Sequence, residues 1–217
     1  MSEDNQFNKT IPVNLKKQLE SDFKGIVHAV YLYGQEYKDL LMIIEDDFGG
    51  DLDPFLPLKK NLGKECESIK LFTVSEFKNS LDVFPIEFLD MKENRELLVG
   101  TDIFLDLHVE DHNLRHESEF YLRSHLLKCR ESFLKGWSSP KQLVQDSLPA
   151  FLKVLKYSLN LTDGTPLMGQ LESVTGLQLP QIKAFIESDL KTVSDASFLA
   201  YLNELSYLNR YMDTCHA

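Results

Sequence analysis

The sequence predicts an α+β protein in which a mixed β-sheet with flanking helices is followed by an all-helical bundle. Short apolar runs rich in β-branched and aromatic residues, which are typical of strands, are confined to residues 1–107. Residues 108–217 instead carry apolar residues at helical spacing. The chain has 217 residues, more than a single domain of common size, so we expect these two parts to be separate domains.

The first part begins with a predicted helix and two strands. Residues 13–24 repeat apolar residues every four positions, and Gly25 ends this helix. The apolar runs 26–33 and 39–45 predict two strands joined at Gly34. A parallel return would need a dozen or more connecting residues, so the strands form an antiparallel hairpin.

The remainder of the first part alternates short helices with strands. We expect a short helix at residues 54–62 and a third strand at 69–73. One or two helical turns follow at 75–81, with Ser75 as the N-terminal cap. The apolar run 84–91 predicts a fourth strand.

The second part contains five predicted helices. Gly136 ends the first of them, and Ser139 followed by Pro140 begins the second, because Ser favours the cap position and Pro the first helical position. The predicted helices span residues 111–135, 140–161, 167–175, 180–190 and 197–214.

Charge and cysteine content exclude several classes of protein. The net charge is −11, and residues 1–107 hold 12 Lys and Arg against 21 Asp and Glu, a net charge of −9. Such a surface repels phosphate backbones, so we expect no general binding of nucleic acid. The three cysteines, Cys66, Cys129 and Cys215, suit neither a zinc site nor a disulfide framework and predict reduced thiols.

The chain lacks the sequence features of a membrane or secreted protein. Its longest apolar run in the first part, residues 40–44, is far shorter than the roughly 20 residues that span a bilayer. The acidic start at Glu3 and Asp4 is unlike a secretory signal. We therefore expect a soluble, cytoplasmic protein with no membrane partner.

Several segments together resemble one bacterial group of uncharacterised nucleotidyltransferase-like proteins. The order of elements also fits: helix, strand, glycine turn and strand, with a helical bundle after the sheet domain. The resemblance covers most of the chain. It is carried by residues 31–34, 39–44, 80–92, 98–102 and 147–152, together with 113–115, 119, 122–123, 126–127 and 130, and 81–92 is its most specific segment.

This resemblance implies a magnesium-dependent transfer of nucleotidyl groups. In the family, two carboxylates at alternate positions of one strand share Mg²⁺, and a third lies on a neighbouring strand. A Gly-Ser turn before them lets backbone N–H groups approach a triphosphate. By position, Gly34 and Gln35 correspond to that turn and Asp39 to one of the paired carboxylates.

The chain departs from the family pattern at the residues that hold the metal. Gln35 stands where the family has Ser, and Tyr37 stands two residues before Asp39, where a second carboxylate is needed. Only Glu87 or Asp90 remains as a third acid. Two separated carboxylates hold Mg²⁺ poorly against its hydration shell.

We therefore expect a catalytically silent protein without a metal or other cofactor, acting as a module that binds a nucleotide or a partner. The alternative is an active nucleotidyltransferase with an atypical carboxylate set, in which Asp39, Glu87 and Asp90 are catalytic and Mg²⁺ is the cofactor.

The long helix at residues 111–135 carries a polar strip between two apolar arcs. At about 100° per residue, one arc holds Leu114, Tyr121, Leu122, His125, Cys129 and Phe133, and the other holds Phe120, Leu127 and Leu134. The strip between them contains His112, His116, Glu119, Arg123 and Arg130.

This strip has two interpretations. It is either a salt-bridge seam between the two domains, with Glu119 paired to Arg123, or a phosphate pocket in which Arg123 and Arg130 bind a nucleotide. His112 and His116 lack a third zinc ligand. The acidic run 45–53 does not match a calcium loop, because Phe48 occupies a ligand position.

Overall fold

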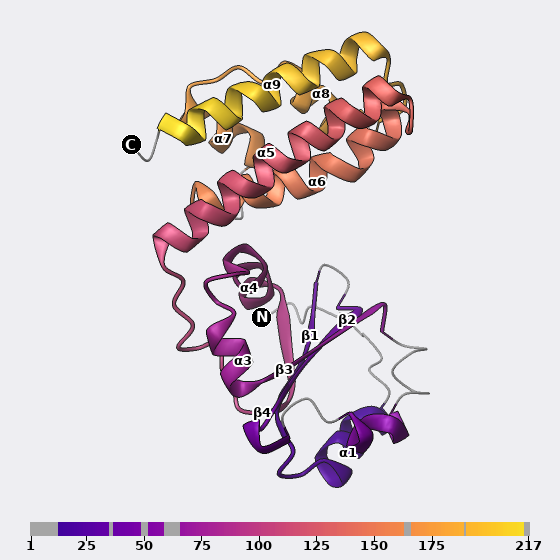
Figure 1. Cartoon of the computed structure of the whole chain (residues 1–217), viewed down its shortest axis with the longest axis vertical. Helices are drawn as coiled ribbons and strands as arrows, with labels where there is room; N and C mark the ends of the chain where they lie inside the picture. Colours follow the sequence, from indigo (N-terminus) through magenta and orange to yellow (C-terminus); the bar gives the residue numbers. More distant parts are fainter. Residues whose placement is uncertain are drawn as a thin grey trace, which may run out of the picture. The chain divides into compact units, whose positions relative to one another are not determined.

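The computed structural model describes residues 13–34, 37–48, 52–58, 66–162, 166–188 and 190–214. The chain divides into two compact units. The first contains residues 1–82 and 87–108, and the second contains residues 83–86 and 109–217 (Figure 1).

The first unit is built on a four-stranded sheet in the order β3-β2-β1-β4. Strand β1 is antiparallel to β2 and β4, whereas β2 is parallel to β3, so the mixed sheet and the β1–β2 hairpin are confirmed. Its elements are α1 (Val13–Asp22), β1 (Val27–Tyr33), β2 (Asp39–Ile44), β3 (Ser68–Thr73), α3 (Val74–Asn79), α4 (Pro85–Glu93) from Glu87 onward, and β4 (Arg95–Gly100), with 3₁₀ turns at Asp46–Phe48 and Asp53–Leu58.

The two faces of the sheet have separate hydrophobic cores. On one face, Leu19 of α1 and Phe23, which follows the helix, pack against alternate residues of the strands, including Val30 and Met42. On the other face, aromatic rings from β1, β3, α3, α4 and the segment after β4 pack edge to face or tilted: Tyr31, Phe72, Phe77, Phe88 and Phe104. Because both faces are covered, β2 is buried along Leu40–Ile44, as its unbroken apolar run predicts.

The predicted fourth strand at residues 84–91 is wrong, because this segment forms helix α4. Pro85 occupies the first helical position, where its missing N–H costs nothing. Pro85, Phe88 and Met91 are buried at a spacing of three, which is a helical pattern. The true fourth strand is β4, whose first residues are polar and charged.

The predicted cap of helix α3 is also corrected. Thr73, not Ser75, is the cap: its side chain accepts a hydrogen bond from the N–H of Glu76, and the Glu76 carboxylate accepts one from the N–H of Thr73. Ser75 instead donates through its N–H and its hydroxyl to the carboxylate of Asp46, at 2.8 and 2.7 Å.

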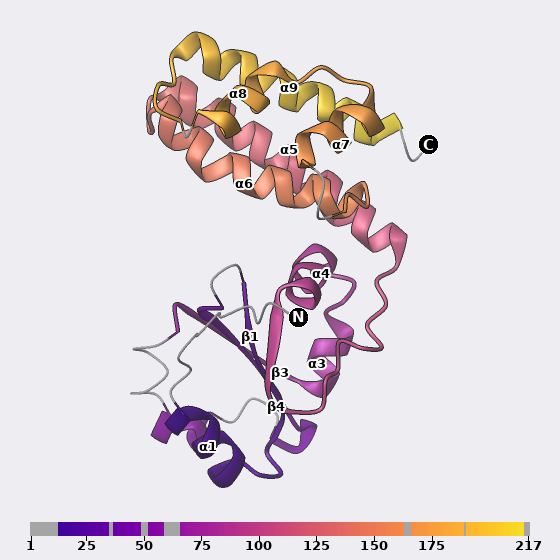
Figure 2. The ribbon, with the colours of Figure 1, turned by 180° about the vertical axis from the view of Figure 1, so that it is seen from behind.

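The second unit is helical, as predicted, and Figure 2 shows α6, α7 and α8 from behind. Gly136 ends α5 with φ = 63°, and the Ser139 hydroxyl accepts a hydrogen bond from the N–H of Gln142 at the start of α6. The helices are α5 (Asp111–Lys135), α6 (Pro140–Ser158), α7 (Leu167–Thr175), α8 (Pro180–Glu187) and α9 (Asp195–Thr214).

Buried hydroxyl groups join the long helices of this unit. Ser118 of α5 and Ser158 of α6 share a hydrogen bond of 2.6 Å, and Ser147 of α6 bonds the hydroxyl of Tyr201 on α9 at 2.9 Å. Around these groups, apolar side chains of α5, α6 and α9 form the core. None of the helices in the described part of the chain has the length and apolar character needed to cross a membrane.

Candidate ligand site

The β1–β2 turn brings a glycine against a carboxylate. Gly34 has φ = +85° and donates its N–H to the carbonyl of Asn94 at 3.0 Å. A side-chain carbon at this position would lie 3.0 Å from Oδ2 of Asp39, so glycine permits both the backbone angle and the close approach of Asp39. Gln35, the other predicted turn residue, lies outside the described residues.

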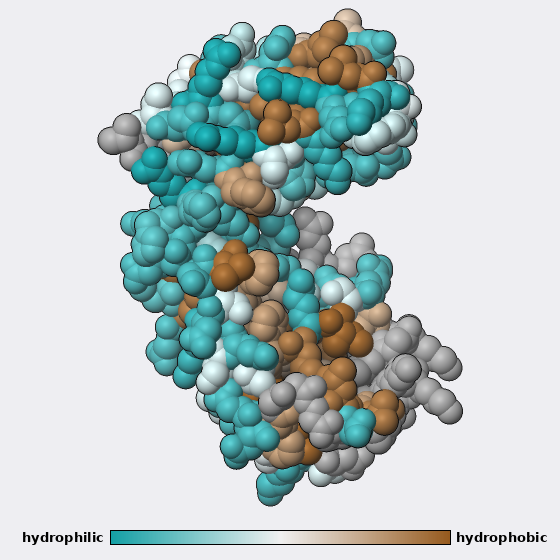
Figure 3. Space-filling view, in the orientation of Figure 1, coloured by the Kyte–Doolittle hydropathy of each residue, from teal (hydrophilic) through white to brown (hydrophobic). Residues whose placement is uncertain are grey.

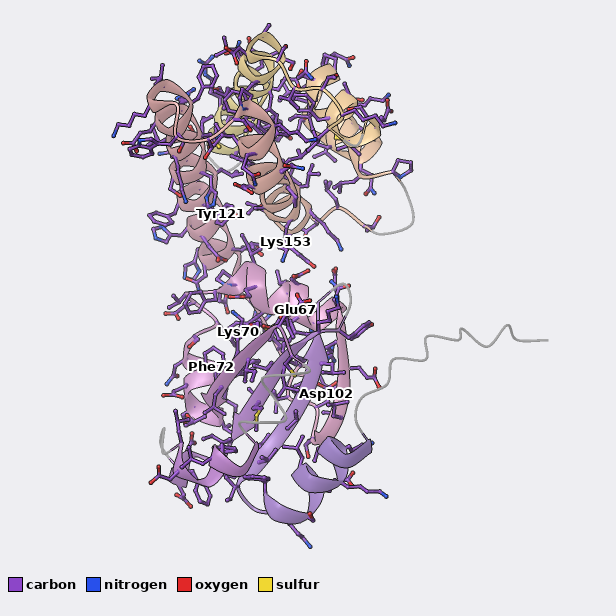
Figure 4. All side chains as sticks on the ribbon, turned by 90° about the vertical axis from the view of Figure 1, so that its right-hand side faces the viewer. Glu67, Lys70, Phe72, Asp102, Tyr121 and Lys153 are labelled. Carbon is purple, nitrogen blue, oxygen red and sulfur yellow. The ribbon has the colours of Figure 1, made fainter. Side chains whose placement is uncertain are left out.

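Polar side chains from three strands gather at this end of the sheet. Asp39 is paired in register with Tyr33 of β1 on one side and with Ser68 of β3 on the other. Lys70 lies two residues beyond Ser68 and so projects from the same face of β3, as does Phe72 (Figure 4). The cluster therefore combines acidic, basic and hydroxyl groups on one face.

An ion pair links this cluster to helix α4. The Nζ atom of Lys70 lies 2.7 Å from Oε1 of Glu87, and both side chains are only partly exposed. Partial burial by itself lowers the pKa of Lys70. The hydrogen bond and charge of Glu87, with the charge of Asp39, outweigh it and raise the pKa above its usual value. Lys70 is therefore a permanent cation at neutral pH.

Tyr33 is the buried member of the same cluster. Burial raises the pKa of Tyr33, a hydrogen bond with Ser68 lowers it in part, and the nearby charges of Lys70, Asp39 and Glu87 also act on it. The net effect keeps its phenol protonated. The carboxylates of Asp39 and Glu87 act on both Tyr33 and Lys70. The cluster is therefore one electrostatic group of five side chains: Tyr33, Asp39, Ser68, Lys70 and Glu87.

The predicted acids are therefore only partly brought together. Asp39 and Glu87 both act on Lys70, but Glu87 comes from a helix and not from a neighbouring strand. Asp90 lies one helical turn further along α4, where its carboxylate accepts a hydrogen bond from Nδ2 of Asn94 at 3.1 Å. Lys70 was not identified from the sequence as a site residue. The sequence feature that could have indicated it is a charged residue on the same side of β3 as Phe72, whose ring packs on Phe88.

The side chains at this site do not fit a magnesium ion. Mg²⁺ requires oxygen ligands in octahedral geometry, and the group next to Glu87 is an ammonium, which donates hydrogen bonds and repels cations. Within the described ranges, no three His, Cys, Asp or Glu side chains gather in a way that could hold a metal ion.

The arginines of the predicted strip contact α9. An Nη of Arg123 lies 2.5 Å from Oδ1 of Asp213, and an Nη of Arg130 donates to the hydroxyl of Ser206 at 2.7 Å. These partners belong to the same unit as the two arginines, and the seam toward the first domain stays a prediction. Their contacts join two helices of one unit, so the two arginines also lie in a different unit from Gly34.

The predicted pair of Glu119 and Arg123 is present, but Arg115 is the closer partner of Glu119. Its Oε1 accepts a hydrogen bond from Nε of Arg115 at 2.8 Å, whereas Arg123 is 3.8 Å away. Near the start of α5 lies a cavity of about 380 Å³. It is lined by Asp111, His112, Leu114, Arg115, Ser158 and Asn160, so His112 but not His116 lines it.

The second apolar arc of α5 is exposed. The exposed fractions of Phe120, Leu127 and Leu134 are 70, 63 and 83%, and Trp137 just beyond the helix is 65% exposed. In Figure 3, hydrophobic patches interrupt the polar surface of this unit. The first arc behaves differently: Leu122 and Cys129 are buried, and Tyr121, labelled in Figure 4 with Lys153 of α6, stacks on His125 at 3.8 Å between ring centroids.

Comparison with models of known protein families, with curated proteins and with solved structures finds no match to this chain. The resemblance to nucleotidyltransferases therefore rests on the residues named above and stays a hypothesis.

Proposed function

We propose that this chain is a catalytically silent, nucleotidyltransferase-like protein that acts by binding a nucleotide or a partner protein. The observation that carries the proposal is the ion pair between Lys70 and Glu87 beside Asp39. A carboxylate that holds Mg²⁺ must coordinate the metal through its oxygens. One oxygen of Glu87 already accepts a hydrogen bond from the ammonium of Lys70.

Two further observations bear on the kind of ligand. Arg123 and Arg130 have partners on α9, which weakens the case for them as phosphate ligands. The exposed apolar residues Phe120, Leu127 and Leu134 support a protein partner, since exposed apolar patches of this kind mark interaction surfaces. The turn at Gly34 favours the second kind of ligand, a nucleotide, because backbone turns with a positive φ can gather N–H groups around an anion.

The experiment is calorimetry of the full chain with ATP, CTP, GTP and UTP, with and without Mg²⁺, together with an assay for released pyrophosphate. A silent binding protein releases no pyrophosphate, and its binding of a nucleotide need not depend on Mg²⁺. Metal-dependent binding with pyrophosphate release, both lost in Asp39→Asn, would establish the alternative of an active transferase with an atypical carboxylate set.

A further inference from the structure

We propose that the ammonium group of Lys70 occupies the position between Asp39 and Glu87 that a shared divalent cation would need, so that this site is closed to Mg²⁺ and binds its ligand without a metal. The inference rests on the proposed function and deepens it, because it names the feature that keeps the site silent.

The position of Lys70 follows from the sheet. Asp39 opens β2 and pairs with Ser68 on the parallel neighbour β3. Lys70 is two residues further along β3 and so points to the same face as Asp39. On that face its Nζ reaches Glu87 at 2.7 Å, so the cation lies among side chains from β1, β2 and α4.

A lysine can replace the charge of a metal but not its chemistry. Its ammonium neutralises one carboxylate at hydrogen-bond distance, and it is held there by the fold and not by coordination. A divalent cation entering the same position would be repelled by the ammonium. It would meet two carboxylates offset by one positive charge, which is too little to compete with its hydration shell.

The substitution Lys70→Glu reverses this charge and tests the idea. Titration of the full chain with Mn²⁺, followed by water-proton relaxation, measures cation binding directly and without any activity assay. We expect at least about tenfold tighter Mn²⁺ binding than in the wild type, because a repelling charge becomes a ligand. Adding Asp39→Asn to Lys70→Glu should abolish the gain, which excludes Mn²⁺ bound elsewhere on the acidic surface.

A matched control has the same charge change away from the site. Lys17 is exposed on α1, and Lys17→Glu should bind Mn²⁺ as the wild type does. If Lys70→Glu fails to fold, as judged by circular dichroism, Lys70→Met removes the charge and keeps the length of the side chain. A gain in Mn²⁺ affinity that Asp39→Asn cancels would again support the proposal.

Two results would overturn it. One is a folded Lys70→Glu or Lys70→Met variant with wild-type Mn²⁺ affinity. The other is Mn²⁺ binding by the wild type that Asp39→Asn abolishes. Such binding without pyrophosphate release would refute only the role of Lys70, whereas binding with pyrophosphate release would also refute the proposed function.

Discussion

The hydroxyl group of Tyr31, at the centre of the sheet, donates a hydrogen bond to the carboxylate of Asp102 at 3.0 Å, and it accepts one from the N–H of Ile103 at 2.8 Å. Asp102 also binds Nη2 of Arg95 at 2.6 Å and the N–H of Phe104 at 3.0 Å. Burial by itself raises the pKa of Asp102, but the hydrogen bonds from Arg95, Phe104 and Tyr31 outweigh it and hold the pKa below its usual value.

Asp102→Ala should therefore destabilise the first unit by about 2–4 kcal/mol, since it removes the carboxylate that the partly buried Arg95 guanidinium and the buried Tyr31 hydroxyl share. Urea unfolding measures the loss. Asp106 is exposed four residues later, and Asp106→Ala should change stability by no more than about 0.5 kcal/mol. Equal effects of the two substitutions would show that the Asp102 network contributes nothing specific.

Arg123→Ala should lower the melting temperature by only about 1–2 °C, because the Arg123 side chain is 55% exposed and exposed ion pairs contribute little. Melting curves of wild type and variant, each with and without ~10 mM phosphate, check this. Phosphate should stabilise neither protein. Stabilisation of the wild type alone would mean that Arg123 binds an anion.

The free energy of unfolding should decrease as pH rises, because of Glu204. This carboxylate is buried on α9 and accepts the N–H groups of Gln181 and Ile182 at 2.8 Å each, at the start of α8. Burial raises the pKa of Glu204, the two hydrogen bonds lower it in part, and the charge of Glu172 adds to the rise. The protonated form is thus favoured more in the folded chain than in the unfolded one.

A raised pKa contributes stability that is fully present below the unfolded value of about 4.3 and is lost as pH rises through the folded value. Each unit of upward shift corresponds to about 1.36 kcal/mol. Denaturant unfolding of wild type and Glu204→Gln between pH 4 and 7 tests this. The stability of the wild type relative to the variant should decline with rising pH, and a constant difference would refute the assignment.

Two leucines on α5 should respond very differently to truncation. Leu122 is buried against the neighbouring helices, and Leu122→Ala should cost about 2–5 kcal/mol. Leu127 is exposed, so Leu127→Ala should cost no more than about 0.5 kcal/mol. Unfolding curves of the two variants compare them. A large loss at Leu127 would mean that the exposed arc is covered in solution.

The helical unit could be predicted closely because its boundaries depend on local signals. Gly136 and the pair Ser139–Pro140 fix the turn between α5 and α6 through backbone angles and caps, which need no distant contact. The prediction of a strand at residues 84–91 was wrong because the structure of this segment depends on distant contacts and not on local signals. Its apolar content suits either a strand or a helix. In the helix, Phe88 packs on Phe72 and Phe77, which are contacts that the local sequence does not reveal.

The candidate site could be predicted only in part, because it depends on neighbours far apart in the sequence. Asp39 and Gly34 could be predicted from the hairpin pattern. The helical wheel predicted on which side of α5 Arg123 lies. It did not reveal that Asp213 of α9 contacts Arg123 on that side. Lys70 depends on the parallel pairing of β2 with β3 and on the helix that carries Glu87, and neither follows from local sequence.

The most direct measurement of the central claim is a crystal structure of the wild-type chain soaked in millimolar Mg²⁺ with a non-hydrolysable nucleoside triphosphate. The account predicts that Lys70 stays in contact with Glu87 and that no octahedral metal density appears on Asp39. A magnesium ion bound by Asp39 and Glu87, with Lys70 displaced, would contradict it.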